Sequence, residues 1–357
     1  MGGTKSTLFF KDKPIFGLDL GTGTVKVMQI NTENKKKRSV VGYGIAGFDP
    51  SAMKDGEIVE PAVVAKATQK LFQSGLIGDI STHRVALSVP TFRTYSREVQ
   101  LPMMNGKELQ EAILSEAEQY IPRPLNELYI DHIVTNKTAS EVSVYIVAVP
   151  QQIIDSYHLL TQMLGLEVVF IEPSIISSTR VLGIDVHHEI PSVLVDFGTR
   201  SADISIYESH VMVTGTVQSG GDLFTDNIRQ ALNVTQEEAV LIKTKYGISL
   251  SKKQDQIKEA VEPLLKQTIR EIKRMIRYYE ERASGKEKIG QVITMGGGAN
   301  MPGLTDYLTE HLRLPARMFD PWQVLDYGKL QPPSYAERSI YMTVAGLALV
   351  ESKGVLR

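Results

Sequence analysis

The sequence predicts an α/β protein of two related lobes, with a small ββαββ unit inserted in the first lobe. Two turns of one design support this prediction. Asp19–Thr24 and Asp196–Ser201 both read Asp, apolar, Gly, Thr, any residue, hydroxyl, and apolar strand-like residues flank both. Strand-like and helix-like segments alternate through both halves of the chain. The 357 residues also exceed the roughly 250–300 at which a single core stops growing.

The first lobe is predicted to cover residues 14–190. It opens with a β-rich stretch from Ile15 to about Phe48, which a helix-like stretch from Pro61 to Leu76 follows. After the inserted unit, a helix from Gln151 to Leu164, a strand at Val168–Ile171 and a helix opened by Pro173 complete the lobe.

The inserted unit is predicted to cover residues 81–150. Its helix has a clear start, because Asn105 is a suitable N-cap and Glu108, three residues later, can reach back as in a capping box. Pro122 and Pro124 end the helix. The four strands around it are expected at Arg84–Pro90, Thr94–Leu101, Leu128–Thr135 and Glu141–Val149.

The second lobe is predicted to cover residues 191–332. After its Asp-x-Gly-Thr turn, Gly220-Gly221-Asp222 begins a helix. A longer helical region from Ile257 to Arg282 carries its apolar residues on one face, which is typical of a helix that packs on a core. A strand at Gln291–Met295 then leads into three consecutive glycines.

The last segment, residues 333–357, is predicted to form a closing helix from Tyr335 to Glu351 that returns to the first lobe. Its most apolar part, Ile340–Val350, is shorter than the roughly 20 residues of a membrane span. The N-terminus lacks the apolar core of a signal peptide, so we expect a cytoplasmic protein. Met1–Ser6 does fit the loose pattern for N-myristoylation.

Composition excludes several classes of function. The formal net charge of −2 gives no sign of the broad basic surface of nucleic-acid-binding proteins, so no nucleic-acid partner is expected. The dense basic cluster Asn34–Arg38 lies between strand-like stretches and is expected to be a solvated hairpin tip. The absence of cysteine excludes disulfides, thiolate metal sites and cysteine nucleophiles.

The paired turns are candidates for holding the phosphates of ATP. Glycine lets the backbone approach a phosphate, and consecutive N–H groups form an anion-binding concavity. Lys26, two residues beyond the first turn, adds a point charge. The candidate phosphate-binding residues are Gly21, Thr22, Gly23 and Thr24 on one side, and Gly198, Thr199 and Ser201 on the other.

Carboxylates that end strands beside phosphates require a cation between them. Asp19 and Asp196 each precede their turn, and Mg²⁺ usually takes one or two carboxylates while keeping several waters. The two aspartates are therefore the candidate Mg²⁺ ligands.

Two later glycine clusters complete the predicted site. Gly220 and Gly221 stand at a helix N-terminus, where backbone dipoles favour an anion. Gly296, Gly297 and Gly298 follow a strand, and three glycines there favour the close approach of a ligand.

Together these motifs resemble the actin-like ATPase superfamily, which has a two-lobed ribonuclease H-like fold. The similarity is closer to the PilM family of type IV pilus assembly proteins and runs from about residue 14 to 350. The markers are Phe16–Val27, Glu111–Pro122 followed by Tyr129–Asp131, and Met295–Leu304 with Asp320–Trp322 beyond it.

The resemblance assigns Met295–Leu304, including Asn300, to the adenosine loop. The superfamily's helix beside the adenine usually reads Ala-Glu-x-x-Lys. Here Lys243 is kept, but Val240 replaces the glutamate that would bond the ribose or base. Glu238 directly precedes Ala239, and successive side chains on a helix point about 100° apart. Glu238 therefore does not substitute for the missing glutamate, which leaves base selectivity open.

The resemblance implies an ATP-binding cytoplasmic scaffold, peripheral to the inner membrane, with weak or no ATP hydrolysis. Its partner would be the N-terminal cytoplasmic tail of a PilN-like membrane protein, bound extended in a groove between the first lobe and the insert. Membrane contact would then come only through partners. Pilus motor ATPases and self-association are further partners that the resemblance leaves open.

Two alternatives remain at this point. A small-molecule kinase of the same superfamily would need a base near the transferred phosphoryl group, for which Asp203 and Glu172 are candidates by position. An FtsA-like division protein would share the insert in general form. FtsA-like proteins usually end in an amphipathic membrane helix, whereas this sequence ends in Glu351–Arg357.

Overall fold

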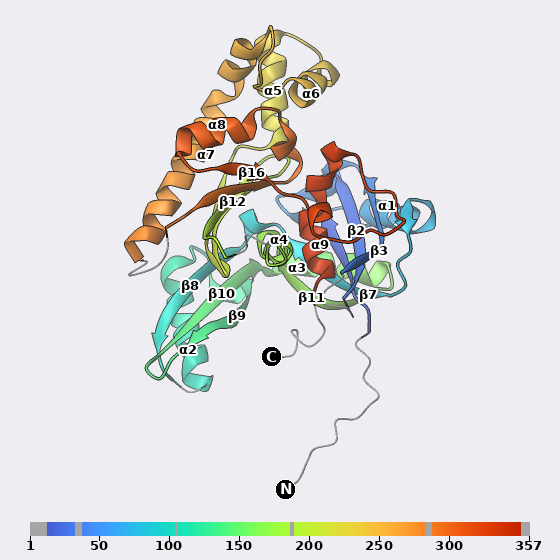
Figure 1. Ribbon diagram of the computed structural model, residues 1–357. Coiled ribbons are helices and arrows are strands. Elements are labelled where there is room, and N and C mark those ends of the chain that lie inside the picture. Colours follow the sequence, from blue (N-terminus) through green and yellow to red (C-terminus); the bar gives the residue numbers. More distant parts are fainter. Residues whose placement is uncertain (1–12, 33–37, 105, 186–188, 283–287, 351–357) are drawn as a thin grey trace.

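Two β-sheets form the frame of the molecule (Figure 1). The computed structural model describes residues 13–32, 38–104, 106–185, 189–282 and 288–350. Among these residues, no helix combines the length and apolarity that crossing a bilayer requires. The predicted features at Met1–Ser6, Asn34–Lys37 and Asn105 lie outside the described residues.

The first sheet has six strands in the order β11-β7-β1-β2-β3-β6. Its central strand β1 pairs antiparallel with β2 and parallel with β7. Helices α1 (Pro61–Ser74) and α3 (Gln151–Met163) pack on it through an apolar cluster. The strands are β1 Phe16–Leu20, β2 Thr24–Asn31, β3 Ser39–Gly47, β6 Leu76–Gly78, β7 Arg84–Val89 and β11 Glu167–Pro173, and a small hairpin, β4 Met53–Lys54 with β5 Glu57–Ile58, lies beside them.

The second sheet has eight strands in the order β16-β15-β12-β13-β14-β8-β10-β9. Within it, β12 pairs antiparallel with β13 and parallel with β15, which repeats the pairing around β1. The strands are β8 Tyr95–Pro102, β9 Leu128–Lys137, β10 Glu141–Pro150, β12 Ser192–Phe197, β13 Ala202–Glu208, β14 His210–Val217, β15 Gln291–Met295 and β16 Ala316–Met318. The helices beside β12–β16 are α5 Gly221–Leu232, α6 Gln236–Lys245, α7 Gln254–Arg282 and α8 Leu304–Leu312.

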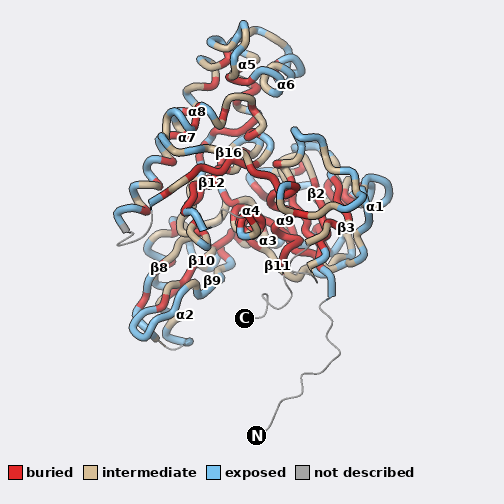
Figure 2. Tube along the Cα trace, viewed as in Figure 1, coloured by how far each residue is buried: buried red, intermediate tan, exposed pale blue. Residues whose placement is uncertain are grey.

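Two short helices, α4 (Ser174–Leu182) and α9 (Met342–Ala348), lie between the sheets. They pack on each other, α9 contacts β1 and β2, and α4 contacts β13 and β14. The buried cluster around them contains Met28 and Tyr43 from the first sheet and Leu194 and Ile293 from the second. Figure 2 shows α4 and α9 mostly buried at this junction, so the two lobes share this cluster besides a core of their own.

The prediction of a ββαββ insert at 81–150 is wrong in its first strand. β7 belongs to the first sheet, where it lies parallel to β1 and β11. The insert therefore consists of β8, α2 (Gly106–Tyr120), β9 and β10, and its strands extend the second sheet. Among the described residues, the ladder between β14 and β8 is a single pair, Val213 with Arg97.

The predicted closing helix is also shorter than expected. The segment begins as a 3₁₀ helix, η6 (Tyr335–Tyr341), and only α9 is α-helical. Glu351, the predicted last residue, lies outside the described residues. Every residue of α9 is buried between the sheets, so the α-helical part of the segment is the part that packs in the core.

The contact between α4 and α9 leads to a prediction about stability. A Cβ on Gly346 would lie 1.7 Å from the backbone oxygen of Ser177, so Gly346→Ala must push the two helices apart. We expect the free energy of unfolding to fall by about 3 kcal/mol, the upper end for an overpacked core. Urea unfolding measures this change. The matched control is Gly106→Ala, because a Cβ there meets nothing within 4 Å; an equal loss in both variants would contradict the packing account.

Candidate functional site

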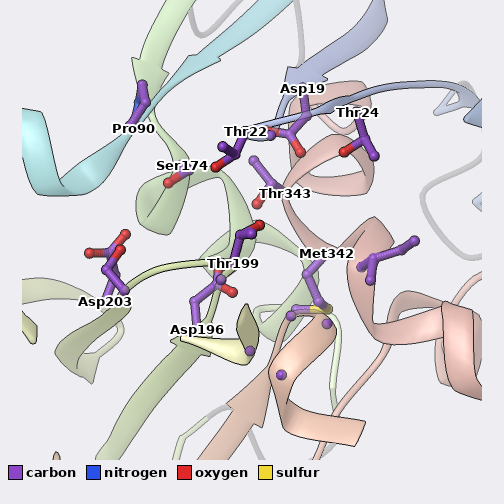
Figure 3. Close-up of a pocket in the computed structure, with 18 of the residues that line it drawn as sticks. Asp19, Thr22, Thr24, Pro90, Ser174, Asp196, Thr199, Asp203, Met342 and Thr343 are labelled. Atoms are coloured by element: carbon purple, nitrogen blue, oxygen red, sulfur yellow. The ribbon is translucent and has the colours of Figure 1, made fainter. Parts of the chain in front are cut away.

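A cavity of about 420 Å³ lies where the two lobes meet, and both Asp-x-Gly-Thr turns line it. Figure 3 shows Asp19 and Thr22 of one lobe facing the same space as Asp196 and Thr199 of the other. Further lining comes from the start of α5, from the 3₁₀ turn η4 (Gly297–Asn300) and from the junction of η6 with α9. Its volume falls in the range of about 300–1,000 Å³ that is typical of small-molecule sites.

The two turns are closed by the same hydrogen bond. The N–H of Gly21 donates to the Thr24 carbonyl at 2.8 Å, and the N–H of Gly198 donates to the Ser201 carbonyl at 2.9 Å. Within the described residues, the N–H groups of Thr22 and Thr199 have no protein acceptor. Each turn therefore offers a backbone donor at the cavity, as anion-binding turns do.

In the first lobe, the carboxylate of the turn is already neutralised. Asp19 stands directly opposite Lys26 in the β1–β2 ladder, and the Lys26 Nζ lies 2.7 Å from Asp19 Oδ2. The Ser88 hydroxyl donates to the other oxygen, Oδ1, at 2.6 Å. Both oxygens of this buried carboxylate are thus occupied.

In the second lobe, the equivalent pair consists of two carboxyl groups. Asp196 stands directly opposite Asp203 in the β12–β13 ladder, at the positions that correspond to Asp19 and Lys26. Burial, with a further effect of the Asp19 charge, raises the pKa of Asp196 to about 6, although Lys26 opposes the shift. Burial raises the pKa of Asp203 to about 7; the hydrogen bond from Thr216 lowers it and the Asp196 charge raises it further. Like charges directly opposite each other destabilise a ladder, so this pair favours a cation.

The start of α5 is packed on the second turn. The N–H of Gly221 donates to the Gly198 carbonyl at 2.8 Å, and the N–H of Asp222 donates to the Thr199 carbonyl at 2.8 Å. A Cβ on Gly220 would lie 2.4 Å from the Thr199 oxygen. These glycines therefore let the helix approach the turn, and the first two N–H groups of α5 are not available to an anion.

Lys243 of α6 reaches the same helix start. Its Nζ donates to the Gly221 carbonyl at 2.8 Å and to the Thr225 hydroxyl at 2.7 Å, and burial lowers its pKa. The side chain lines the cavity and supplies a positive charge near Asp222. By contrast, Val240 is 42% exposed and lies outside the lining, while the Glu238 carboxylate is bound in a capping box with Thr235.

The triple glycine brings the η4 backbone against the second turn. Gly296 has φ of +81°, and a Cβ there would lie 2.2 Å from Asp196 Oδ1. A Cβ on Gly298 would lie 2.8 Å from the Phe197 Cβ. Gly297 differs, because the nearest atom to its Cβ would be at 3.5 Å, on Ile340. The loop therefore forms a wall of the cavity whose middle residue has room for a side chain.

Most of the predicted site residues line this cavity: Asp19, Gly21, Thr22, Thr24, Lys26, Asp196, Gly198, Thr199, Ser201, Gly221, Lys243, Gly296, Gly297 and Gly298. Gly23, Gly220 and Asn300 do not. The Asn300 amide instead joins η4 to η6, donating to the Ser339 hydroxyl and the Ala336 carbonyl, both at 2.8 Å. Gly23 packs near Pro50, which would lie 3.0 Å from a Cβ.

The sequence reading missed several lining residues: Ser88, Ser174, Asp222, Ser339, Ile340, Met342 and Thr343. Ser88 meets Asp19 because β7 pairs with β1, whereas the sequence predicts this strand in the insert. The residues of η6 and α9 carry no motif, since their place in the wall depends on the chain returning between the lobes.

The two candidate bases differ in position. Asp203 lines the cavity, but Glu172 does not. The Glu172 carboxylate is buried in an ion pair with Arg180, whose Nη2 lies 2.6 Å from Oε2, and it accepts a hydrogen bond from the Ser177 hydroxyl at 2.8 Å. Glu172, near the end of β11, therefore has a structural role, because it binds two side chains of α4.

The oxygen ligands at the cavity suit a cation that the protein and a phosphate hold together better than a metal site built from protein side chains alone. Among the described residues, no group of three or more His, Cys, Asp or Glu side chains is arranged to hold a metal ion. Asp196 and Asp203 supply oxygen ligands of the kind that Mg²⁺ takes one or two of, and phosphates and waters usually complete its shell.

Comparison with known proteins gives matches over nearly the whole chain. The cell division protein FtsA of Pseudomonas aeruginosa is 23% identical over 361 residues, covering 87% of this chain and 84% of FtsA. A solved PilM–PilN type IV pilus biogenesis complex aligns with a TM-score of 0.82 at 20% identity, covering 97% of this chain and 100% of the matched one. MreB5 of Spiroplasma citri bound to AMPPNP aligns with a TM-score of 0.54 at 12% identity, covering 94% and 95% of the two chains.

These structural matches confirm the two-lobed actin-like fold. The family described as type IV pilus assembly protein PilM matches residues 17–352. The chain therefore belongs to the PilM family of type IV pilus assembly proteins.

Proposed function

We propose that this chain is an ATP-binding scaffold of the type IV pilus assembly platform, which docks the N-terminal tail of a PilN-like membrane protein. The observation that carries the proposal is the cavity between the lobes, with one backbone donor in each turn and an acidic pair on one side. The family match and the likeness to a PilM–PilN complex support the partner.

In this proposal, the N–H groups of Thr22 and Thr199 bind phosphate oxygens from opposite sides. The Lys26 ammonium pairs with the Asp19 carboxylate and so offsets its repulsion of the phosphates. Asp196 and Asp203 would hold Mg²⁺, with Asp203 in place of the predicted Asp19, whose two oxygens already have partners. The cation would supply the charge that neutralises the phosphates. Lys243 fixes the start of α5, and the η4 backbone covers the adenosine.

The arrangement favours binding over chemistry. A kinase needs a free base beside the transferred phosphoryl group and a site for the acceptor. Glu172 is held by Arg180, and Asp203 accepts a hydrogen bond from Thr216 at 2.6 Å besides facing Asp196. We therefore propose weak or no ATP hydrolysis, with the small-molecule kinase as the less favoured alternative.

A groove of about 350 Å³ between the first lobe and the insert is the proposed docking site for the tail. The β4–β5 hairpin and the start of α3 form one side, and the start of β8 with Arg123 forms the other. The lining contains both signs of charge, including Lys54, Asp55 and Glu57, together with Phe92 and Tyr95. Such a surface suits an extended peptide with apolar anchors and polar flanks.

The groove and the nucleotide cavity share Phe92. This side chain is 42% exposed and lies in a 3₁₀ turn, η2 (Thr91–Arg93), which directly follows β7. Because one residue touches both spaces, a nucleotide that changes the lobe interface also changes the groove wall. We propose this contact as the physical basis of coupling between ATP and the tail.

Docking through the tail would hold the protein at the cytoplasmic face of the inner membrane without a membrane contact of its own. Pilus motor ATPases and further copies of the chain are proposed as additional partners.

Gly297→Leu tests the nucleotide site. Its side chain has room at the cavity wall, so the fold should be retained while the ligand space is filled. We expect ATP affinity, measured by isothermal titration with Mg²⁺, to fall by at least about tenfold, which is about 1.4 kcal/mol. Gly106→Leu, in the insert, is the control and should bind as wild type. Unchanged ATP affinity in Gly297→Leu would contradict the proposal that the adenosine lies against η4.

Asp196→Asn tests the acidic pair through its pH dependence. The raised pKa of Asp196 means that its proton stabilises the folded state at low pH, and that this stability is lost as the pH rises through about 6. At pH 8 without metal, the variant should therefore melt about 2–4 °C above wild type, whereas near pH 4 the two should coincide. Added Mg²⁺ should reduce the difference at pH 8. A difference that is independent of pH would contradict the buried-charge account.

Coupling between the sites predicts that a synthetic PilN-like tail peptide binds the apo and ATP-loaded proteins with affinities that differ by about 5-fold or more. In Phe92→Ala, peptide binding should persist with a smaller ratio. Equal peptide affinities for the apo and ATP-loaded wild type would contradict the coupling, because a ligand that binds both states equally does not shift the equilibrium between them.

A further inference from the structure

A second cavity, of about 530 Å³, lies between α2 and α7 above the joint of β8 and β14. It shares no lining residue with the nucleotide cavity. Tyr120 at the end of α2 lies on one side, and Arg274 and Tyr278 of α7 lie on the other. The cavity thus sits between the insert and the second lobe, where the described residues of β8 and β14 form one ladder pair, Val213 with Arg97.

Arg97 occupies a position on β8 that the strand pattern reserves for an apolar residue. Side chains two apart on a strand share a face, and Val99 and Leu101 on that face are buried in the core of the insert. Tyr95, on the same face, packs in the neighbouring cluster. An arginine in this row is costly unless something meets its charge.

In the described part of the chain, no carboxylate forms an ion pair with Arg97. The Nε of Arg97 is buried without a hydrogen-bond partner, and so is the hydroxyl of Tyr120. The guanidinium carbon lies 5.6 Å from the centre of the Tyr120 ring, which orients the arginine along the cavity wall. Burial raises the pKa of Tyr120 to about 12, so its hydroxyl remains a donor at neutral pH.

The remaining polar groups of the wall are largely occupied by one another. Ser96 bonds to the Thr214 hydroxyl at 3.0 Å and accepts from Tyr145 at 2.9 Å. Arg274 Nε donates to Glu271 at 2.8 Å and its Nη2 binds the other carboxylate oxygen, so this ion pair adds little net charge to the wall. Two unmet donors, one of them on the cationic Arg97, select an occupant with negatively charged oxygen acceptors.

We propose that this cavity binds a small oxyanion, a phosphate or carboxylate group, through the Arg97 guanidinium and the Tyr120 hydroxyl. The bound anion joins β8 and α2 of the insert to α7 of the second lobe. It therefore adds a link across a joint that already has one ladder pair and the side-chain contacts Ser96–Thr214 and Glu98–His210, and it stabilises the insert by mass action.

The test is amide hydrogen exchange of the full chain in inorganic phosphate or citrate, against chloride of equal ionic strength. In wild type, amides of β8 and β14 should exchange several-fold more slowly with at least one of the two anions. Protection by phosphate alone identifies a phosphate site, and protection by citrate alone identifies a carboxylate site. No protection by either anion overturns the proposal.

Arg97→Leu separates binding from folding. Leucine suits the apolar row, so without anion the variant should melt about 2–4 °C above wild type, and the anion should no longer slow exchange. Arg97→Lys should retain part of the protection. Lys137→Gln removes a positive charge from an exposed position on the same insert and should respond as wild type. Protection that persists fully in Arg97→Leu, or is lost equally in Lys137→Gln, contradicts the site.

Discussion

The two turns at the lobe interface have one backbone design but opposite electrostatics, and the account of the site depends on this difference. Asp19 faces Lys26, whereas Asp196 faces Asp203 at the corresponding ladder positions. The first turn is neutral by itself. The second carries two carboxyl groups whose pKa values are raised to about 6 and about 7, chiefly because burial disfavours their charged forms, with added repulsion from Asp19 on Asp196 and from Asp196 on Asp203. A cation is the simplest group that relieves this repulsion, and polyphosphates accompany such a cation in many sites.

The packing between the lobes gives a physical basis for the proposed coupling between the lobe-interface cavity and the docking groove. α4 and α9 pack between the sheets, so a change in the lobe interface must be accommodated by closely packed helices rather than by a loose hinge. Ser88, one residue before the end of β7, lines the cavity between the lobes, and the chain continues through Phe92 into the insert. The proposed nucleotide cavity, the proposed docking groove and the cavity beside Arg97 thus lie along one short stretch of chain.

Much of the fold could be predicted from the sequence, because its signals are local. The repeated turns identified two lobes, and the spacing of the glycines identified most of the cavity wall. The allocation of β7 to a sheet could not be predicted, since a buried strand followed by an insert reads the same in either sheet. The partners of Asp19, Glu172 and Asn300 depend on long-range packing, which the local pattern does not contain.

The central claim is that the acidic second turn holds phosphates through a cation. Its most direct test is the affinity of the wild-type protein for ATP, measured by isothermal titration with Mg²⁺ and again with the metal removed by EDTA. The account predicts binding with Mg²⁺ that weakens by at least about tenfold without it, a change of about 1.4 kcal/mol or more. Equal affinities in the two conditions, or tighter binding without the metal, would contradict it.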